Sequence, residues 1–439
     1  MAKTYDTYKD SGIAWIGEIP GEWRVDILSL HLYDHCLYND NLKENNLLSL
    51  SYGRIIRKDI NTKEGLLPSS FNRYNIIDKG DIVLRLTDLQ NDKKSLRTGL
   101  CKERGIITSA YLTLRNRGYD DSSFLHYLLH TYDLCKVFYG MGNGVRQGMN
   151  YSDVRKIKIP CPPLSVQQSI SSFLDTKCGE IDSLISIQEE MISELLAYKQ
   201  SVITEAVTKG LDKKAKMKNS GVEWIGDIPE EWESVPIKHL KANVENAFVD
   251  GPFGSNLKSQ HFIDNGDVYV IESGFVTSGK FIYKPFKEIS LEHFKTIKRS
   301  ECKAGDIIIA KIGAKYGMGA ELPKLDKPSV VSGNSLKITL DNTKILNHIF
   351  VYLLITAKAE GGYRDLVQEN AQPALSLGGL NNFKLPLPPL PVQQAIATYL
   401  DEKTSQIDSL IALKQSKIES LKEYKKSIIY EYVTGKKRV

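Results

Sequence analysis

The sequence predicts an α+β protein with two mixed α/β modules, separated by two long helices that pair as an antiparallel coiled coil. Two repeated segments predict this pseudo-twofold, circular tandem plan. "SGIAWIGEIPGEW", which begins at Ser11, returns as "SGVEWIGDIPEEW" at Ser220, with nine of 13 positions identical. The 47 residues Pro162–Thr208 align without a gap with Pro388–Thr434, and 24 are identical. Repeats of this kind indicate duplicated structural units.

The composition is typical of a globular protein with more than one domain. The chain has 439 residues, of which 41% are hydrophobic and 25% charged, and this length suggests two to four domains. The six cysteines form no CxxC pair, which argues against a zinc site or a disulfide framework and fits the reducing cytoplasm. No apolar run reaches the roughly 18 residues of a membrane span. The net charge of +5 permits a polyanionic partner without requiring one.

The repeats divide the chain into four predicted segments. Their ends are alike and their middles differ, so the two modules are expected to share a scaffold and to be specialised differently. The four segments are a first module at 1–159 with its entry motif at 11–23, a central helix at 160–210, a linker and second module at 211–385 with its entry motif at 220–232, and a C-terminal helix at 386–439.

A heptad pattern after each Pro-Pro pair predicts the two helices. Gln188 and Lys414 put a polar residue at the same place in each, where it would fix the register. Packing of each helix on its own module is the alternative, but the apolar stripe continues beyond the face of one module. The predicted seam consists of Leu174, Ile181, Leu184, Gln188, Leu195, Tyr198, Leu400, Ile407, Leu410, Lys414, Leu421 and Tyr424, and Ile185, Ile192, Ile411 and Ile418 widen it on one flank.

Polar and basic loops lie between predicted strands such as "GDIVLRL" at Gly80 and "GDIIIAKIG" at Gly305. Arg, Lys, Asn, Gln, Ser and Tyr are the side chains that contact phosphates and base edges. The alternative is that these loops are ordinary solvated connections, which usually have this composition. The candidate DNA-binding residues are Arg54, Arg57, Lys58, Lys94, Arg97, Arg146, Gln147, Asn150, Tyr151, Ser255, Asn256, Lys258, Lys311, Lys315, Tyr316, Asn334, Gln368 and Asn370.

Catalytic motifs do not emerge from the sequence. "GFVTSGKF" at Gly274 nearly matches a phosphate-binding loop, but Phe281 stands where the hydroxyl that binds Mg²⁺ is needed. The HxxxH pairs His31/His35 and His126/His130 lack the glutamate of a zinc protease and are expected to be surface or core-edge histidines. We therefore expect no catalytic residue and no metal ligand, which favours recognition over reaction.

The motifs "SG..WIG.IP..W", "PPL.VQQ.I...LD.K...ID.LI" and "SLKEYKKSII.E.VTGK" resemble those of the specificity subunits of type I restriction–modification enzymes. The resemblance covers nearly the whole chain. It implies two target recognition domains, each reading half of a bipartite asymmetric site in double-stranded DNA. The helical rod would fix the spacer and dock two modification subunits, which two restriction subunits join. S-adenosylmethionine, ATP and Mg²⁺ would then be bound by those partners, not by this non-catalytic cytoplasmic chain.

Two other functions stay open at this point. The chain could be a hydrolase with a phosphate-binding loop or a nuclease, or a coiled-coil adaptor that binds proteins only. The tryptophans of the entry motifs, Trp15 and Trp23 in the first and Trp224 and Trp232 in the second, are expected to hold each module on the scaffold.

Overall fold

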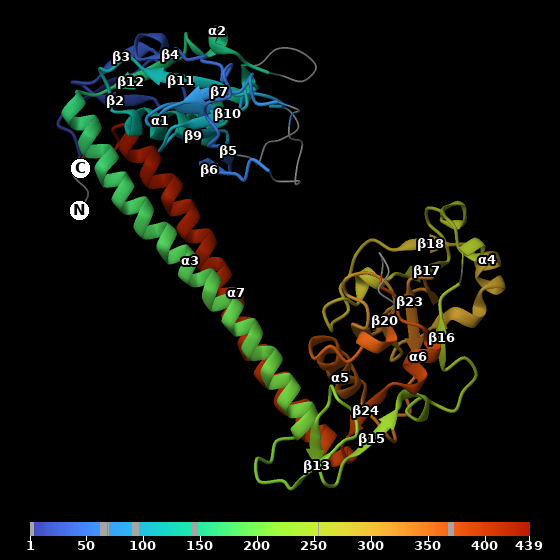
Figure 1. Cartoon of the computed structure of the whole chain (residues 1–439). Helices are drawn as coiled ribbons and strands as arrows, with labels where there is room; N and C mark the ends of the chain where they lie inside the picture. The colour runs from blue at the N-terminus through green and yellow to red at the C-terminus, as the bar shows by residue number, and fades with distance from the viewer. Residues whose placement is uncertain are drawn as a thin grey trace. The chain divides into compact units, whose positions relative to one another are not determined.

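Two units make up the chain in the computed structural model (Figure 1). The first comprises residues 1–189 and 415–439 and the second residues 190–414, so each unit contains one module and part of each long helix. In the part of the chain that the structure describes, no helix is both long enough and apolar enough to cross a membrane. The segment boundaries expected from the repeats stay a prediction. The described residues are 4–61, 68, 70–89, 96–141, 148–252, 254–367 and 373–439.

The first unit begins with a strand hairpin and ends its module at the start of a long helix. Its elements are β1 (Tyr8–Asp10), β2 (Glu18–Pro20), β3 (Arg24–Ile27), β4 (Leu32–Asp34), β5 (Leu48–Ser51), β6 (Arg54–Arg57), β7 (Asn75–Ile77), β8 (Ile82–Leu84), β9 (Thr98–Leu100), β10 (Gly105–Ile107), β11 (Leu112–Asn116), α1 (Ser122–Leu134), α2 (Tyr151–Val154), β12 (Lys158–Cys161) and the first part of α3 (Leu164–Lys209).

Among the described residues, the second unit has the same number of strands and one further helix, α4. Its elements are β13 (Met217–Asn219), β14 (Asp227–Pro229), β15 (Glu233–Pro236), β16 (Phe248–Asp250), β17 (Val268–Ile271), β18 (Lys287–Ile289), α4 (Leu291–Thr296), β19 (Glu301–Cys302), β20 (Ile307–Ala310), β21 (Gly319–Glu321), β22 (Ser329–Val331), β23 (Ser335–Ile338), α5 (Asn347–Ala359), α6 (Leu377–Asn382), β24 (Lys384–Leu387) and the first part of α7 (Leu390–Val433).

The two modules are built on the same antiparallel four-stranded sheet. The strand order is β4-β11-β8-β9 in the first module and β16-β23-β20-β21 in the second. The inner strands β8 and β20 are buried along their whole length, as the apolar runs after the Gly-Asp turns predicted. Gly80 and Gly305 make these turns at φ +96° and +90°, a conformation that favours glycine. The duplication therefore extends through the module cores, beyond the repeated ends visible in the sequence.

The modules differ next to this shared sheet. The first module has the hairpin β5-β6 and the strand pair β7-β10, whereas the second has a further four-stranded sheet in the order β18-β17-β22-β19. The pair β19-β22 corresponds to β7-β10, and β17 and β18 take the place of β5 and β6, because Leu47 next to β5 bridges Ile106 of β10 in parallel as β17 pairs with β22. β17 and β18 lie in the segment before Gly305 where the second copy is longer. The structural variation is thus concentrated on one side of a common frame.

The long helices α3 and α7 pair antiparallel in each unit (Figure 1). In the first unit the rings of Phe173 and Tyr432 lie 4.5 Å apart, and Asp182 Oδ1 lies 2.7 Å from Lys425 Nζ. In the second unit the Lys199 ammonium bonds the Asp408 carboxylate at 2.5 Å. As residue numbers rise along α3, the numbers of the contacting residues on α7 fall, so the two helices run antiparallel. The helices thus pair with each other, as expected.

One of the two predicted sets of seam positions is wrong. The seven-residue series from Leu174 and from Leu400 is buried or half-buried, including Gln188 at 6% exposure. The second contact of each heptad lies four residues after these positions instead of three, and is occupied by residues such as Ile185 and Ile418. The residues three positions after the series lie exposed beside the seam: Leu184, Tyr198, Leu410 and Tyr424.

The C-terminal end of a long helix packs against each entry motif. Trp23 is fully buried. Gly435, which follows the end of α7 and has φ +73°, lies against its ring, and an added Cβ on Gly435 would lie 3.1 Å from the indole. Gly210 after α3 stands in the same relation to Trp232, at 3.2 Å and φ +77°. Glycine in this left-handed conformation is a common helix end. The last helix of the chain therefore packs on the first entry motif, as a circular repeat predicts.

The repeated "VQQ" segment joins each module to the helix that follows it. Gln167 Oε1 accepts a hydrogen bond from the Asp121 amide at 2.9 Å, and its Nε2 donates to the Pro162 carbonyl at 3.0 Å. Gln393 repeats both bonds with the Leu346 amide and the Pro388 carbonyl. Both glutamines are buried, so their amides satisfy backbone groups at a helix start.

Candidate functional site

Loops from distant parts of the second module meet at one end of its central sheet. The Lys311 amide donates to the Asn334 carbonyl and its own carbonyl accepts from the Leu375 amide, each at 2.9 Å. An added Cβ on Gly251 would lie 1.9 Å from the Ser332 carbonyl oxygen, so the two chains can approach this closely because residue 251 is glycine. The sequence-predicted loops around residues 250, 311, 334 and 375 thus form one surface.

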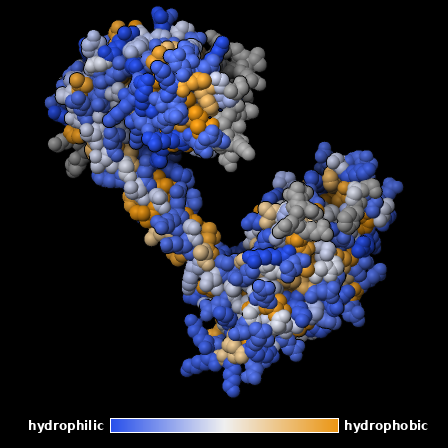
Figure 2. Space-filling view, in the orientation of Figure 1, coloured by the Kyte–Doolittle hydropathy of each residue, from blue (hydrophilic) through white to orange (hydrophobic). Residues whose placement is uncertain are grey.

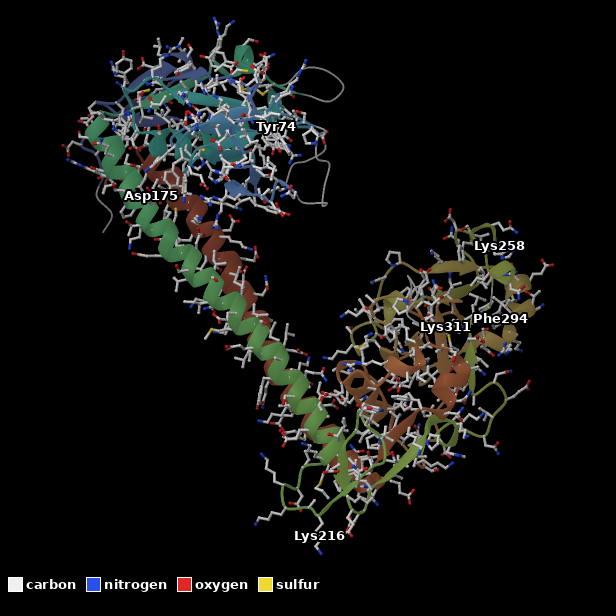
Figure 3. All side chains as sticks on the ribbon, viewed as in Figure 1. Tyr74, Asp175, Lys216, Lys258, Phe294 and Lys311 are labelled. Atoms are coloured by element: carbon white, nitrogen blue, oxygen red, sulfur yellow. The ribbon has the colours of Figure 1, made fainter. Side chains whose placement is uncertain are left out.

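Lys311 is a correction to the predicted contacts on this surface. Its side chain is 9% exposed and its ammonium lies 3.4 Å from Asp250 Oδ2, while Asp250 Oδ1 lies 3.4 Å from Arg299 Nη2. Figure 3 shows Lys311 within the module and Lys258 toward its outer edge. The buried lysine therefore holds the loops, and Arg299, with 62% of its side chain exposed, is a surface cation that the loop pattern missed. The predicted residues that lie exposed here are Asn256, Lys258, Lys315 and Asn334.

Tyr316 has a different environment from its exposed neighbour Lys315. Its ring is half-buried against the core of the second module, and the Lys358 ammonium lies 3.1 Å from the ring centroid. This cation–π contact and the core packing position Tyr316 from within the module.

The strand β6 carries two of the predicted residues of the first module, and a third follows it. Arg57 forms a paired interaction with Glu103, with Nε at 2.7 Å from Oε1, and this carboxylate raises the pKa of the guanidinium. Arg54 Nη2 lies 2.8 Å from Asp182 Oδ2 on α3. Lys58 follows the strand and is exposed. All three cations lie at the surface, and two of them are partly neutralised by carboxylates.

Arg97 is a second correction, because its side chain is fully buried. Its guanidinium donates to the carbonyls of Thr87 at 2.7 Å and Asp88 at 3.2 Å, and to the Tyr139 hydroxyl at 3.0 Å. Asp88 has φ +57°, the strained conformation of a tight turn. Arg97 therefore stabilises the turn at Asp88 from inside the module and does not present its charge at the surface.

Asn150 and Tyr151 lie at the start of α2. The Asn150 side chain accepts a hydrogen bond from the Ser152 amide at 2.8 Å and so caps the helix, while the residue itself is exposed. The Tyr151 hydroxyl donates to the Leu32 carbonyl at 3.0 Å, and its ring packs on the core. Asn150 thus faces solvent, and Tyr151 has a structural contact.

The remaining predicted contacts cannot be placed. The residues Lys94, Arg146, Gln147, Gln368 and Asn370 lie outside the described residues, as does the side chain of Ser255.

An ionic triplet in each unit went unnoticed in the sequence. In the first, Asp182 lies between Arg54 of the module and Lys425 of α7. In the second, Asp408 lies between Lys199 of α3 and Lys280 of the module, and its distance to Lys280 is 3.4 Å. Burial raises the pKa of the Asp408 carboxyl, but the two ammonium groups outweigh burial and leave the pKa below its usual value.

The two triplets connect each module to both helices in the same way. The aspartates occupy equivalent repeat positions, as do Lys199 and Lys425, so aligning the repeats for charge as well as for apolar residues could have found them. Lys280, the lysine of the near-match phosphate loop, is thus part of a module–helix contact. The segment after it, before β18, is not a helix, in contrast to a true phosphate-binding loop.

Comparison with known proteins agrees with this duplicated plan. The family model described as "Type I restriction modification DNA specificity domain" matches residues 109–196 and 229–423. The specificity subunit of the type I restriction enzyme MjaVIII of Methanocaldococcus jannaschii is 28% identical over 374 residues, which cover 84% of this chain and 81% of that one. A protein of the same organism assigned as the MjaX specificity subunit is 25% identical, covering 97% and 96%.

A solved chain from a study of assembly and conformational transition of the type I R-M system has the same fold. Its TM-score is 0.69 at 15% sequence identity, over 95% of this chain and 99% of that chain. The family model spans more than half of the residues, once in each copy of the repeat. This chain therefore belongs to the family of type I restriction–modification DNA specificity subunits.

Proposed function

We propose that each module of this DNA sequence-recognition subunit reads one half of a bipartite, asymmetric site in double-stranded DNA. The observation that carries the proposal is the common sheet with different loops in the two modules, each mounted on the helices by equivalent contacts. Two identical readers would need an inverted-repeat site, whereas two different readers on one chain can recognise unlike half-sites.

The exposed polar residues of the loops are the proposed contacts. Lys58, Lys258 and Lys315 carry ammonium groups suited to phosphates, which position a protein on the duplex. Asn256 and Asn334 are exposed amides of the type that pairs with adenine in the major groove. Together with the untested residues outside the described part of the chain, they make up the proposed reading surfaces.

The helix pair would set the distance between the half-sites. α3 has 46 residues and α7 has 44, so each is on the order of 65 Å long. A continuous α-helix is stiff and has a fixed rise per residue, so its length translates into a fixed DNA spacer.

Two modification subunits would dock on the helices, and two restriction subunits would complete the complex. Large apolar side chains are exposed on α3 and α7, and Figure 2 shows apolar patches along these helices. Contiguous exposed apolar surface marks protein interfaces. S-adenosylmethionine, ATP and Mg²⁺ would be bound by those partners. Beyond the first turn of each helix, the exposed side chains are Leu184, Ile187, Met191, Leu196 and Tyr198 on α3, and Leu410, Leu413 and Tyr424 on α7.

The proposal is tested by DNA binding of the reconstituted complex with the modification subunit. In each module we replace two exposed cations by alanine, Lys58 with Arg57 in the first and Lys258 with Lys315 in the second. Each double variant should bind specific DNA at least about tenfold more weakly and with a smaller salt dependence, because phosphate contacts are lost. Lys213→Ala and Lys214→Ala, in the exposed linker after α3, serve as the matched control. Undiminished binding by both double variants would refute the proposed surfaces.

A further inference from the structure

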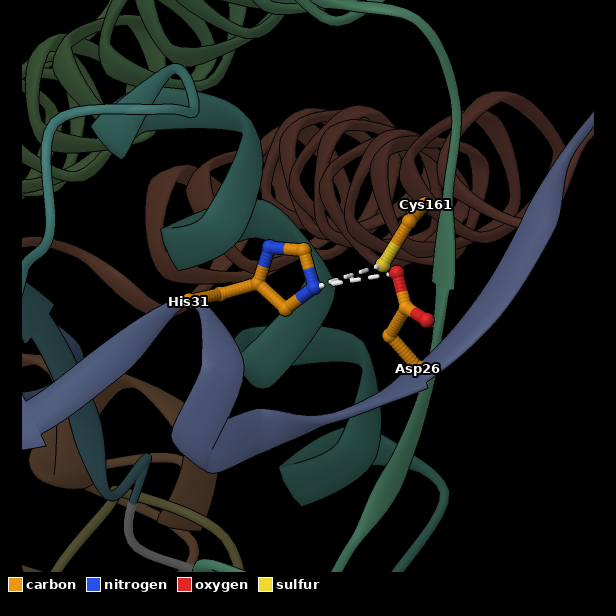
Figure 4. A group of neighbouring side chains, drawn as sticks. All are labelled: Asp26, His31 and Cys161. Carbon is orange, nitrogen blue, oxygen red and sulfur yellow. Dashed lines mark hydrogen bonds and ion pairs between the residues drawn. The ribbon is translucent and has the colours of Figure 1, made fainter.

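A buried group of metal-ligating side chains lies at the base of the first module. His31 ends the 3-10 turn after β3 and is 7% exposed, and Cys161, the last residue of β12, is 4% exposed. Asp26 extends from β3 toward both, with 25% of its side chain exposed. Figure 4 shows the same ring nitrogen of His31 facing the thiol and the carboxylate.

The spacing of the three ligand atoms fits one tetrahedral zinc ion. His31 Nε2 lies 3.4 Å from Asp26 Oδ2 and 3.3 Å from Cys161 Sγ, and all three atoms lie within 4.8 Å of one another. Tetrahedral zinc, with bonds of about 2.0 Å to nitrogen and oxygen and about 2.3 Å to sulfur, separates such ligands by about 3.3 and 3.5 Å. The cluster needs little rearrangement to accept the ion.

The outer nitrogen of His31 has the partner that zinc-binding histidines commonly have. His31 Nδ1 lies 2.7 Å from Asp120 Oδ2, and Asp120 Oδ1 accepts a hydrogen bond from Gln167 Nε2 at 2.9 Å. A carboxylate on Nδ1 fixes the tautomer that presents Nε2 to a metal and raises its basicity. The orientation of the ligand is therefore set by a second layer of contacts.

The second module replaces the whole cluster by apolar residues. The strand pair β15-β24 has the same register as β3-β12, which makes the two sites directly comparable. Leu240 and Ile345 are fully buried there. The four residues change together, as expected of a set that acts as one site. The residues in place of Asp26, His31, Asp120 and Cys161 are Val235, Leu240, Ile345 and Leu387.

We propose that Asp26 Oδ2, His31 Nε2 and Cys161 Sγ bind one Zn²⁺ ion, with water as the fourth ligand and Asp120 as the positioning residue. The ion would join β3 to β12, the strand that leads directly into α3. The sequence pattern predicted no metal ligand, because the three residues are far apart in the chain and do not form a spaced motif.

Protons compete with the ion at this site. Without metal, the hydrogen bonds to Asp120 and Cys161 raise the pKa of His31 to about 10, against the effect of burial. The charged and titratable groups around the ring are Asp26, Asp120, Cys161 and, beside Asp26, Arg24. An imidazole nitrogen and a sulfur must be deprotonated to bind zinc, so zinc affinity should rise with pH.

The test measures metal content of the untagged full chain after incubation with Zn²⁺ and removal of free metal. We expect one zinc per chain, and with Co²⁺ as probe the visible bands of a tetrahedral site together with a thiolate charge-transfer band. Cys161→Ala should abolish both signals, whereas Cys178→Ala, a buried cysteine on α3 of the same unit, should retain them. Asp120→Asn should lower the affinity about 10- to 100-fold.

A folding control comes from the second module itself. The fourfold variant Asp26→Val, His31→Leu, Asp120→Ile and Cys161→Leu installs its apolar residues and should fold without zinc, as shown by a cooperative thermal transition. Absence of a cobalt–thiolate band in the wild-type chain would overturn the proposal. Retention of stoichiometric zinc by the Cys161→Ala or the folded fourfold variant would overturn it as well.

Discussion

At the scale of single residues, loop cations have two kinds of role that the sequence alone does not separate. Lys58 and Lys258 are exposed, whereas Arg97 and Lys311 come from similar polar loops and lie buried. A guanidinium has five donors, so it can satisfy several carbonyls of a turn from inside. Whether a loop cation faces DNA or the interior depends on contacts between segments that lie far apart in the sequence.

Arg97→Met should therefore reduce stability before it affects recognition. It removes the guanidinium donors of the Thr87 and Asp88 carbonyls, and we expect the free energy of unfolding of the first module to fall by about 3 kcal/mol. Denaturant unfolding measures this. Arg57→Met, which removes an exposed cation, is the control and should leave the midpoint nearly unchanged. A DNA-binding defect in Arg97→Met at wild-type stability would contradict the structural role.

His126 and His130 of α1 predict acid sensitivity of the first module. Burial lowers the pKa of His126 to about 3 and of His130 to about 4, below the 6.5 of an exposed histidine. The unfolded chain binds these protons first, so stability should be lost as pH falls from about 6.5 toward 4, by at most about 1.4 kcal/mol per pH unit for each histidine. His31 has a raised pKa and acts in the opposite direction, losing stabilisation between about 6.5 and 10.

Thermal unfolding at pH 7 and pH 5 checks this titration. The His130→Gln variant should show a smaller drop in melting temperature between the two pH values than the wild type. His348→Gln, an exposed histidine on α5, is the matched control and should not change the drop. An equal drop in all three chains would mean that His130 does not contribute to the acid sensitivity.

At the scale of elements, the helices were predictable in length and pairing but not in the details of their seam. Both flanks of the seven-residue series carry apolar residues, and on the correct flank the series includes Lys199 and Lys425. These lysines made that flank look more polar, yet their ammonium groups pair with Asp408 and Asp182 beside the seam. The three-dimensional ion pairs decide which flank is used.

In the modules, too, some elements were predictable from the sequence and others were not. The strands after the Gly-Asp turns were predictable because they are continuous apolar runs, and both are inner strands of a sheet. That the two modules share the same four-stranded sheet was not predictable, because a shared strand order does not require a shared sequence. The Asp26–His31–Cys161 cluster was missed for a related reason, since strand pairing brings its members together across 135 residues of chain.

Lengthening both helices together should change the DNA spacer. Insertion of one heptad after Glu194 of α3 and one after Leu413 of α7, opposite positions in the second unit, preserves the seam and adds about 10 Å. At about 3.4 Å per base pair, we expect a spacer longer by about three base pairs and unchanged half-sites. Methylation sequencing of cells with the variant and its modification subunit measures both. An unchanged spacer would exclude the helices as the ruler.

At the scale of the whole molecule, the chain is one plan used twice. The entry motifs, the sheets, the hydrogen bonds of Gln167 and Gln393 and the ionic triplets recur in equivalent positions, while the loops beside the sheets differ. In a circular repeat of this kind, each module contacts the helices in the same way. The modules should therefore be exchangeable, and what each reads should travel with it.

Replacing residues 233–385 by residues 24–159 tests this central claim most directly, because the resulting chain carries the first module twice. The measurement is genome-wide methylation sequencing with the modification subunit present. Since the two helices are antiparallel, we predict a methylated target that is an inverted repeat of one original half-site, with the other half-site lost. Methylation that still falls on the original asymmetric site would contradict the assignment of one half-site to each module.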